Sequence, residues 1–159
     1  MGSQRVGQVF NDYNVSTAKH IVLSEYDPDT LGKMDFPLIV KPADCNSSKG
    51  VKKVENQKEL EMAFNDAKQF SRTSTVIVEE FIDGPELSID VYVEDGEAHI
   101  LSVSKLDKIA DKDKFVIFRS CYPASDSEVL MNNIKKTAQQ IADAFGLKNT
   151  PMLGHSKNF

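Results

Sequence analysis

The strongest constraint on the fold is a run of alternating apolar and polar or aromatic residues at positions 87–93. An alternation with period two is typical of a β-strand that buries one face. Asp95-Gly96 follows, and this dipeptide predicts a two-residue hairpin turn. Residues 98–103 are expected to form the returning strand. The chain is therefore predicted to contain an antiparallel sheet with one apolar face.

Strands and helices are predicted before this hairpin as well. Residues 36–42 form a short apolar run between two prolines, which indicates a buried strand, and a second such strand begins at Thr75. Residues 57–70 carry apolar side chains at helical spacing. Asn56 is the expected N-cap of this helix, with Glu59 as its capping-box partner.

After the hairpin, a charged stretch at 105–114 is expected to connect to a strand at 115–118. Ser125, with Glu128 three residues later, predicts the start of a long helix, and Gly146 is its expected C-cap. The order of elements, with a hairpin between two helices, indicates an α+β fold rather than a doubly wound parallel sheet.

Composition excludes several classes of protein. The 159 residues suffice for one domain or two small lobes, and 40% hydrophobic residues allow a packed core. The net charge of -5 disfavours nonspecific binding of nucleic acid. No apolar run approaches the roughly 20 residues of a membrane span, and no secretion signal is visible. Cys45 and Cys121 form no C-x-x-C pair, so a reduced, cytoplasmic protein is expected. From the net charge and the lack of a membrane span, neither a nucleic-acid nor a membrane partner is expected.

Lys41 ends the first apolar strand and is followed by a polar loop, residues 44–50. An ammonium group suits phosphate oxygens, and a loop with Ser47, Ser48 and Gly50 lets backbone N–H groups approach the same anion. The loop has neither the Walker pattern nor the glycines of a dinucleotide fingerprint. The alternatives are a lysine that reaches water from a strand end and an ordinary solvated turn.

Two adjacent carboxylates, Glu79 and Glu80, end the second apolar strand. Neighbours on a strand point to opposite faces, so one of them faces the packed side and needs a hydrogen-bond donor. An adenine amino group would be such a donor, and Glu86 would accept from ribose hydroxyls. The alternative is that surface lysines pair with these carboxylates. The three histidines show no metal-ligand spacing, and no nucleophile motif is present.

Taken in order, these segments resemble the ATP-grasp enzymes. Residues 36–51, Phe-Pro-Leu-Ile-Val-Lys-Pro-Ala-Asp-Cys-Asn-Ser-Ser-Lys-Gly-Val, resemble the first strand and the phosphate loop of that family. Residues 76–90, Val-Ile-Val-Glu-Glu-Phe-Ile-Asp-Gly-Pro-Glu-Leu-Ser-Ile-Asp, resemble its adenine-binding hinge. The similarity covers residues 13–152. It is closest to the carboxylate-amine ligase branch, near carbamoyl-phosphate synthetase large chains and purine-pathway ligases.

The resemblance implies a site for ATP and Mg²⁺. Lys41 would contact the α- and β-phosphates, and the loop 44–50 would fold over them as a lid. In such enzymes Mg-ATP phosphorylates a small-molecule carboxylate, and an amine or a similar nucleophile attacks the acyl phosphate. The protein contributes positioning and charge neutralisation.

The resemblance also implies how adenosine is held. The Glu79 side chain would accept a hydrogen bond from the adenine amino group, the backbone of Glu80 and Ile82 would bracket the ring, and Glu86 would hold the ribose. The complete set of expected nucleotide-binding residues is Lys41, Ser47, Ser48, Gly50, Glu79, Glu80, Ile82 and Glu86.

The sequence departs from the family pattern near both ends. A second basic phosphate ligand, expected well before Lys41, and the acidic metal ligands, expected after the long helix, are not found. We therefore expect a truncated ATP-grasp fragment that is weakly active or inactive and binds ATP weakly. Its expected parts are a connecting segment (1–35), a lid subdomain (36–83), a partial C-terminal subdomain (84–153) and a tail (154–159). The alternatives are a noncatalytic nucleotide-binding module and an interaction domain with relic motifs, forming a homodimer over an unfinished sheet edge.

Overall fold

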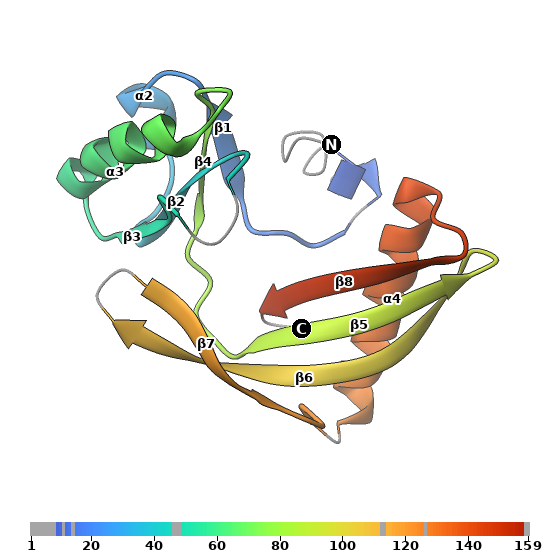
Figure 1. Ribbon diagram of the computed structural model, residues 1–159. Coiled ribbons are helices and arrows are strands. Elements are labelled where there is room, and N and C mark those ends of the chain that lie inside the picture. The colour runs from blue at the N-terminus through green and yellow to red at the C-terminus, as the bar shows by residue number, and fades with distance from the viewer. Residues whose placement is uncertain are drawn as a thin grey trace. The chain divides into compact units, whose positions relative to one another are not determined.

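Figure 1 shows a computed structural model of the chain, in which residues 9–10, 12–13, 15–45, 49–111, 114–125 and 127–157 are described. The chain forms two compact units. Most of the first unit is Thr17–Phe81, and most of the second is Ile82–Ile109 together with Val116–Phe159. No helix in the described ranges is long and apolar enough to cross a membrane.

The first unit is a four-stranded antiparallel sheet in the order β1-β4-β2-β3. Its elements are β1 (His20–Leu23), α2 (Pro28–Leu31), β2 (Leu38–Pro42), β3 (Lys52–Val54), α3 (Gln57–Phe70) and β4 (Val76–Glu80). Side chains of α3, such as Leu60 and Phe64, pack against Leu38, Val40 and Val78 of the sheet, and all of these are fully buried. Burial of such side chains removes apolar surface from water and is the main source of stability for the unit.

Helix α3 confirms the prediction for residues 57–70. The Asn56 side chain accepts a hydrogen bond from the Glu59 amide at 3.1 Å, and the Glu59 carboxylate accepts one from the Glu55 amide at 2.9 Å. These bonds satisfy backbone donors that the first turn of a helix leaves without partners. The capping residues therefore fix where α3 begins.

The second unit is a four-stranded sheet in the order β7-β6-β5-β8. Its elements are β5 (Glu86–Glu94), β6 (Glu97–Asp111), β7 (Lys114–Cys121), α4 (Glu128–Phe145) and β8 (Thr150–Lys157). Helix α4 lies along one face of this sheet (Figure 1), where Ile134 and Ala138 pack against Ile89, Val91 and Val93 of β5. This packing confirms the predicted apolar face and the α+β fold.

Two predicted turns in the second unit are also confirmed. Asp95 and Gly96 have φ angles of 49° and 95° between β5 and β6, as a tight hairpin turn requires. Gly146 has φ 59° and caps the C-terminus of α4.

The prediction of a charged connection at 105–114 is wrong, because β6 runs on to Asp111 and β7 begins at Lys114. Charged side chains are tolerated on these strands because neighbouring strands supply partners. Asp107 is bound by Arg119 of β7 at 2.6 Å, and Lys108 reaches Glu86 of β5 at 2.6 Å. The strand predicted at 115–118 is present and extends to Cys121.

The predicted N-cap Ser125 is also wrong. Ser127 is the N-cap of α4, and its hydroxyl accepts from the Leu130 amide at 3.4 Å. Ser125 lies two residues earlier, where its hydroxyl accepts a hydrogen bond from the Ser127 amide at 3.1 Å. Both serines bind a backbone amide, but only Ser127 is placed to satisfy a donor of the first helical turn.

The segment predicted to begin a tail at residue 154 lies instead in β8, which continues to Lys157. Strand β8 pairs with β5 along its whole length, from Val93↔Thr150 to Glu86↔Lys157. The segment contains proline, glycine and histidine and no run of β-branched residues, so its own sequence indicates a strand only weakly. Pairing with β5 supplies the backbone partners that its composition does not predict.

Candidate functional site

Two of the predicted ligands, from distant parts of the chain, meet in the first unit. Lys41 lies in β2 and Glu79 lies in the neighbouring strand β4. The register pairs Lys41 with Ile77 and Ile39 with Glu79, so the two charged side chains are diagonal neighbours on one face of the sheet. Lys41 Nζ donates a hydrogen bond to Glu79 Oε1 at 2.7 Å.

This pair is only partly buried, with 34% of the Lys41 side chain and 24% of the Glu79 side chain exposed. The lysine supplies a donor for the Glu79 carboxylate, in line with the alternative of lysine pairing. An ammonium group carries three N–H donors, so Lys41 can hold Glu79 and bind a second acceptor at the same time. A phosphate oxygen would be such an acceptor.

The described ends of the predicted phosphate loop are both anchored near the end of α3. At the first end, Asp44 accepts hydrogen bonds from the amides of Arg72 and Thr73, each at 3.2 Å. A hydrogen bond from the Ser71 hydroxyl, together with these amides, lowers the pKa of the Asp44 carboxyl below its usual value. Asp44 therefore stays ionised and bound to the turn that follows α3.

At the other end of the loop, Gly50 has φ +71°, a conformation that favours glycine. A Cβ atom at this position would lie 2.8 Å from Phe70 Cδ2 and 3.0 Å from Pro42 Cγ. Gly50 is thus required both for its backbone conformation and for its close packing. The two predicted loop ligands Ser47 and Ser48 lie outside the described residues.

The predicted hinge, residues 76–90, begins in β4 and continues beyond its last residue, Glu80. The Glu80 amide donates to the Lys19 carbonyl at 3.0 Å, and the Phe81 amide donates to the Pro37 carbonyl at 3.1 Å. Neither bond uses the Glu80 carbonyl or the Ile82 amide, which are the groups able to accept from and donate to the edge of an adenine ring. These two bonds therefore anchor the hinge through amides that have no predicted contact with the ring.

In the second unit, Glu86 is the first residue of β5, and 11% of its side chain is exposed. Lys108 Nζ lies 2.6 Å from Glu86 Oε2, and His155 Nδ1 lies 3.6 Å from Glu86 Oε1. Lys157 Nζ donates to the Ile82 carbonyl at 3.2 Å. Strands β6 and β8 therefore supply the surroundings of two predicted nucleotide ligands, Ile82 and Glu86.

Sequence reasoning missed Lys108, His155 and Lys157 as members of this cluster. The sequence predicts a connection at Lys108 and a tail at the other two residues. In the structure, exposed and less exposed residues alternate along β8 from Thr150 to Ser156, as expected for a strand with one face towards solvent. Within the described part of the chain, no three His, Cys, Asp or Glu side chains come together as a metal site would require.

Comparison with known proteins identifies the family to which the chain belongs. The model of the ATP-grasp domain matches residues 34–155. A D-alanine–D-alanine ligase of Pseudomonas entomophila is 42% identical over 93 residues, which are 57% of this chain and 29% of the ligase. One of Flavobacterium johnsoniae is 28% identical over 152 residues, which are 88% of this chain and 46% of the ligase. The chain thus spans less than half of these curated relatives.

Solved structures share the fold. An L-amino acid ligase from Bacillus licheniformis matches with a TM-score of 0.79 and 23% identity, over 98% of this chain and 36% of that protein. A D-alanine–D-alanine ligase from Bacillus anthracis, complexed with ATP, matches with a TM-score of 0.77 and 20% identity, over 99% of this chain and 50% of that protein. These likenesses confirm the predicted ATP-grasp fold. The family model covers more than half of the chain, and the chain therefore belongs to the ATP-grasp family.

Proposed function

We propose that this chain is the ATP-binding portion of an ATP-dependent ligase that activates a carboxylate as an acyl phosphate for attack by an amine. The observation that carries the proposal is the Lys41–Glu79 contact of 2.7 Å. It brings together a cation suited to phosphate and a carboxylate suited to an amino group, although 38 positions separate them in the sequence.

Each ligand has a defined task in this proposal. Lys41 neutralises phosphate charge, and the Glu79 carboxylate accepts a hydrogen bond from the adenine amino group. The backbone of Glu80 and Ile82 binds the ring edge, and Glu86 accepts from the ribose hydroxyls. Tight positioning of these groups is the protein's main contribution to phosphoryl transfer.

Family membership implies Mg²⁺ as well as ATP. The described residues do not fit a magnesium site of their own, since no three acidic, histidine or cysteine side chains gather among them. We therefore assign no magnesium ligand and no step to the metal. The roles above rest on contacts to the nucleotide alone.

The test of the adenine assignment compares ATP with GTP. Guanine carries a carbonyl where adenine carries its amino group, and a carboxylate at Glu79 can only accept, so the wild type should bind ATP about tenfold or more tightly than GTP. Glu79→Gln introduces a donor and should narrow this preference. Glu61→Gln, an exposed site on α3, is the matched control. Equal affinity of the wild type for ATP and GTP would contradict the assignment of Glu79 to the adenine amino group.

The ligase part of the proposal has a separate test. Phosphate release from ATP should rise when small carboxylates and amines are added together, and Lys41→Ala should abolish the increase. Saturable ATP binding without such release would instead identify a noncatalytic nucleotide-binding module.

A further inference from the structure

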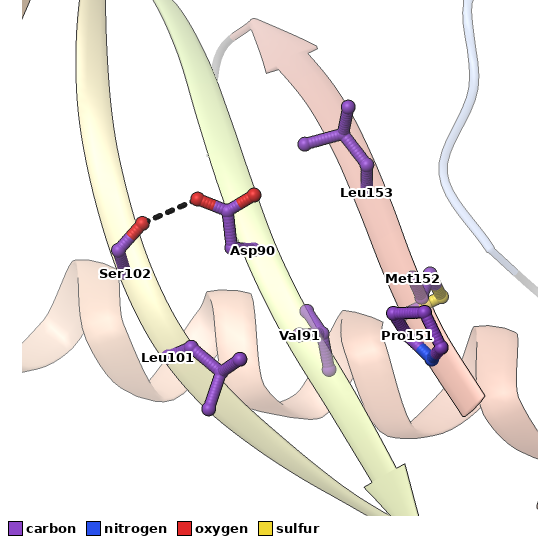
Figure 2. Close-up of a pocket in the computed structure, with 7 residues that line it drawn as sticks. All are labelled: Asp90, Val91, Leu101, Ser102, Pro151, Met152 and Leu153. Atoms are coloured by element: carbon purple, nitrogen blue, oxygen red, sulfur yellow. Dashed lines mark hydrogen bonds between the residues drawn. The ribbon is translucent and has the colours of Figure 1, made fainter. Parts of the chain in front are cut away.

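The face of the second sheet opposite α4 carries a shallow groove of about 500 Å³ that no nucleotide role uses. Figure 2 shows it across strands β6, β5 and β8, with α4 behind the sheet. We call it the open-face groove. Its lining residues are Asp90, Val91, Leu101, Ser102, Pro151, Met152 and Leu153.

Asp90 is the single ionisable side chain among these seven residues. Ser102 Oγ donates to Asp90 Oδ2 at 2.5 Å, which fixes the carboxylate. Figure 2 shows the other carboxylate oxygen directed to the β8 side of the groove. An ionised carboxylate only accepts hydrogen bonds. This oxygen can therefore bind a hydrogen-bond donor, most strongly a cationic one, and it repels an anion.

Aliphatic side chains flank this carboxylate. Leu101 is 64% exposed and Leu153 is 65% exposed. The β5–β6 ladder pairs Asp90 with Ser102 but Val91 with Ile100, so Leu101 is the extra residue of a bulge. Leu153 lies directly opposite Asp90 on β8. Exposed leucines beside a fixed carboxylate match a ligand with a cationic head and an aliphatic body.

We propose that the open-face groove binds a primary amine that carries a short branched aliphatic group. Asp90 binds the ammonium, and Leu101 and Leu153 contact the aliphatic group. In the reaction proposed above, and resting on it, this ligand is the amine co-substrate. Asp90 and Glu86 lie on the same face of β5, four residues or about 13 Å apart. The amine and the predicted ribose ligand are thus held by one strand.

The binding test uses the full chain without ATP, with 3-methylbutan-1-amine and the uncharged 3-methylbutan-1-ol as probes. The wild type should bind the amine about fivefold more tightly than the alcohol, the upper range for an exposed ion pair. Asp90→Asn keeps an acceptor for Ser102 and should bring the two affinities to the same value. Leu153→Ser should weaken both probes. Asp143→Asn, an exposed aspartate on α4, is the charge-matched control and should change neither.

Three results would overturn the proposal: no saturable binding of the amine to the wild type, unchanged amine affinity in Asp90→Asn, or unchanged affinity for both probes in Leu153→Ser. The titration needs no nucleotide. A chain that failed to bind ATP would refute the proposed function but leave this measurement interpretable.

Discussion

At the scale of single residues, Lys41 and Glu79 form an ion pair whose stability contribution is small. Partly exposed pairs of this kind contribute about 1 kcal/mol or less. Their side chains remain 34% and 24% exposed, so a ligand can still reach both. The pair therefore matters more for what it can bind than for holding the first unit together.

Gly50 offers a stability prediction at the same scale. Gly50→Ala should lower the free energy of unfolding by about 1–2 kcal/mol because of the positive φ. The close contact with Phe70 should lower it by about 1–3 kcal/mol more. Gly146→Ala is the control, because φ there is 59° and no atom lies within 4 Å of the added Cβ. Urea unfolding should show the larger loss for Gly50→Ala, relieved in part by Phe70→Leu. Equal losses at the two glycines would contradict the packing role.

Lys157 provides a binding prediction. It holds the Ile82 carbonyl at 3.2 Å, so Lys157→Ala should weaken adenosine binding by about threefold to tenfold and leave tripolyphosphate binding unchanged. Lys157→Arg should restore part of the affinity, and Lys148→Ala, an exposed lysine just before β8, should have no effect. Calorimetric titration measures both ligands. An equal loss for tripolyphosphate would show that Lys157 does not act through the hinge.

At the scale of elements, helix α3 is stabilised at each end by a carboxylate. The Glu55 amide and the Asn56 side chain lower the pKa of Glu59, and the Ser71 hydroxyl and nearby amides lower the pKa of Asp44. A carboxyl whose pKa is lower in the folded state stabilises the fold at pH values above its unfolded pKa. That stability is lost as the pH falls through the folded pKa.

The pH dependence of unfolding tests whether the carboxylates of Glu59 and Asp44 stabilise the two ends of α3. Glu59→Gln and Asp44→Asn should each be less stable than the wild type at pH 6, and the differences should shrink as the pH falls below the usual values of 4.5 and 3.8. Glu61→Gln, on the same helix, controls for the loss of a charge. Urea unfolding at a series of pH values measures the effect. A difference that stayed constant into acid would contradict the proposed role of the carboxylates.

Elements with local signals could be predicted from the sequence, and elements held by distant partners could not. The caps of α3 and the Asp95-Gly96 turn lie within a few residues of what they specify, and both predictions are confirmed. The charged part of β6 depends on Arg119 and Glu86 from other strands. Strand β8 depends on its register with β5. Such partners cannot be read from a local pattern.

The candidate site divides in the same way. Lys41 and Glu79 could be chosen from strand ends, yet their direct contact depends on the β2–β4 register. The proximity of His155 to Glu86 depends on the pairing of β8 with β5. Chemical type was therefore predictable, whereas the neighbours of each group required the tertiary structure.

At the scale of the whole molecule, each unit has its own apolar core, one around Phe64 and one around Ile134. The chain passes from the largest part of the first unit to the second unit between Phe81 and Ile82. The proposed phosphate and adenine ligands Lys41 and Glu79 belong to the first unit, and the proposed ribose ligand Glu86 belongs to the second. The account is therefore tested by one substitution in each unit.

The most direct test of this central claim is a calorimetric titration of ATP, adenosine and tripolyphosphate into the wild type, Lys41→Ala and Glu86→Gln. Lys41→Ala should weaken ATP and tripolyphosphate by about tenfold or more and change adenosine little, because Lys41 holds phosphate charge. Glu86→Gln should weaken ATP and adenosine and leave tripolyphosphate unchanged. ATP binding that is indifferent to both substitutions would contradict the account.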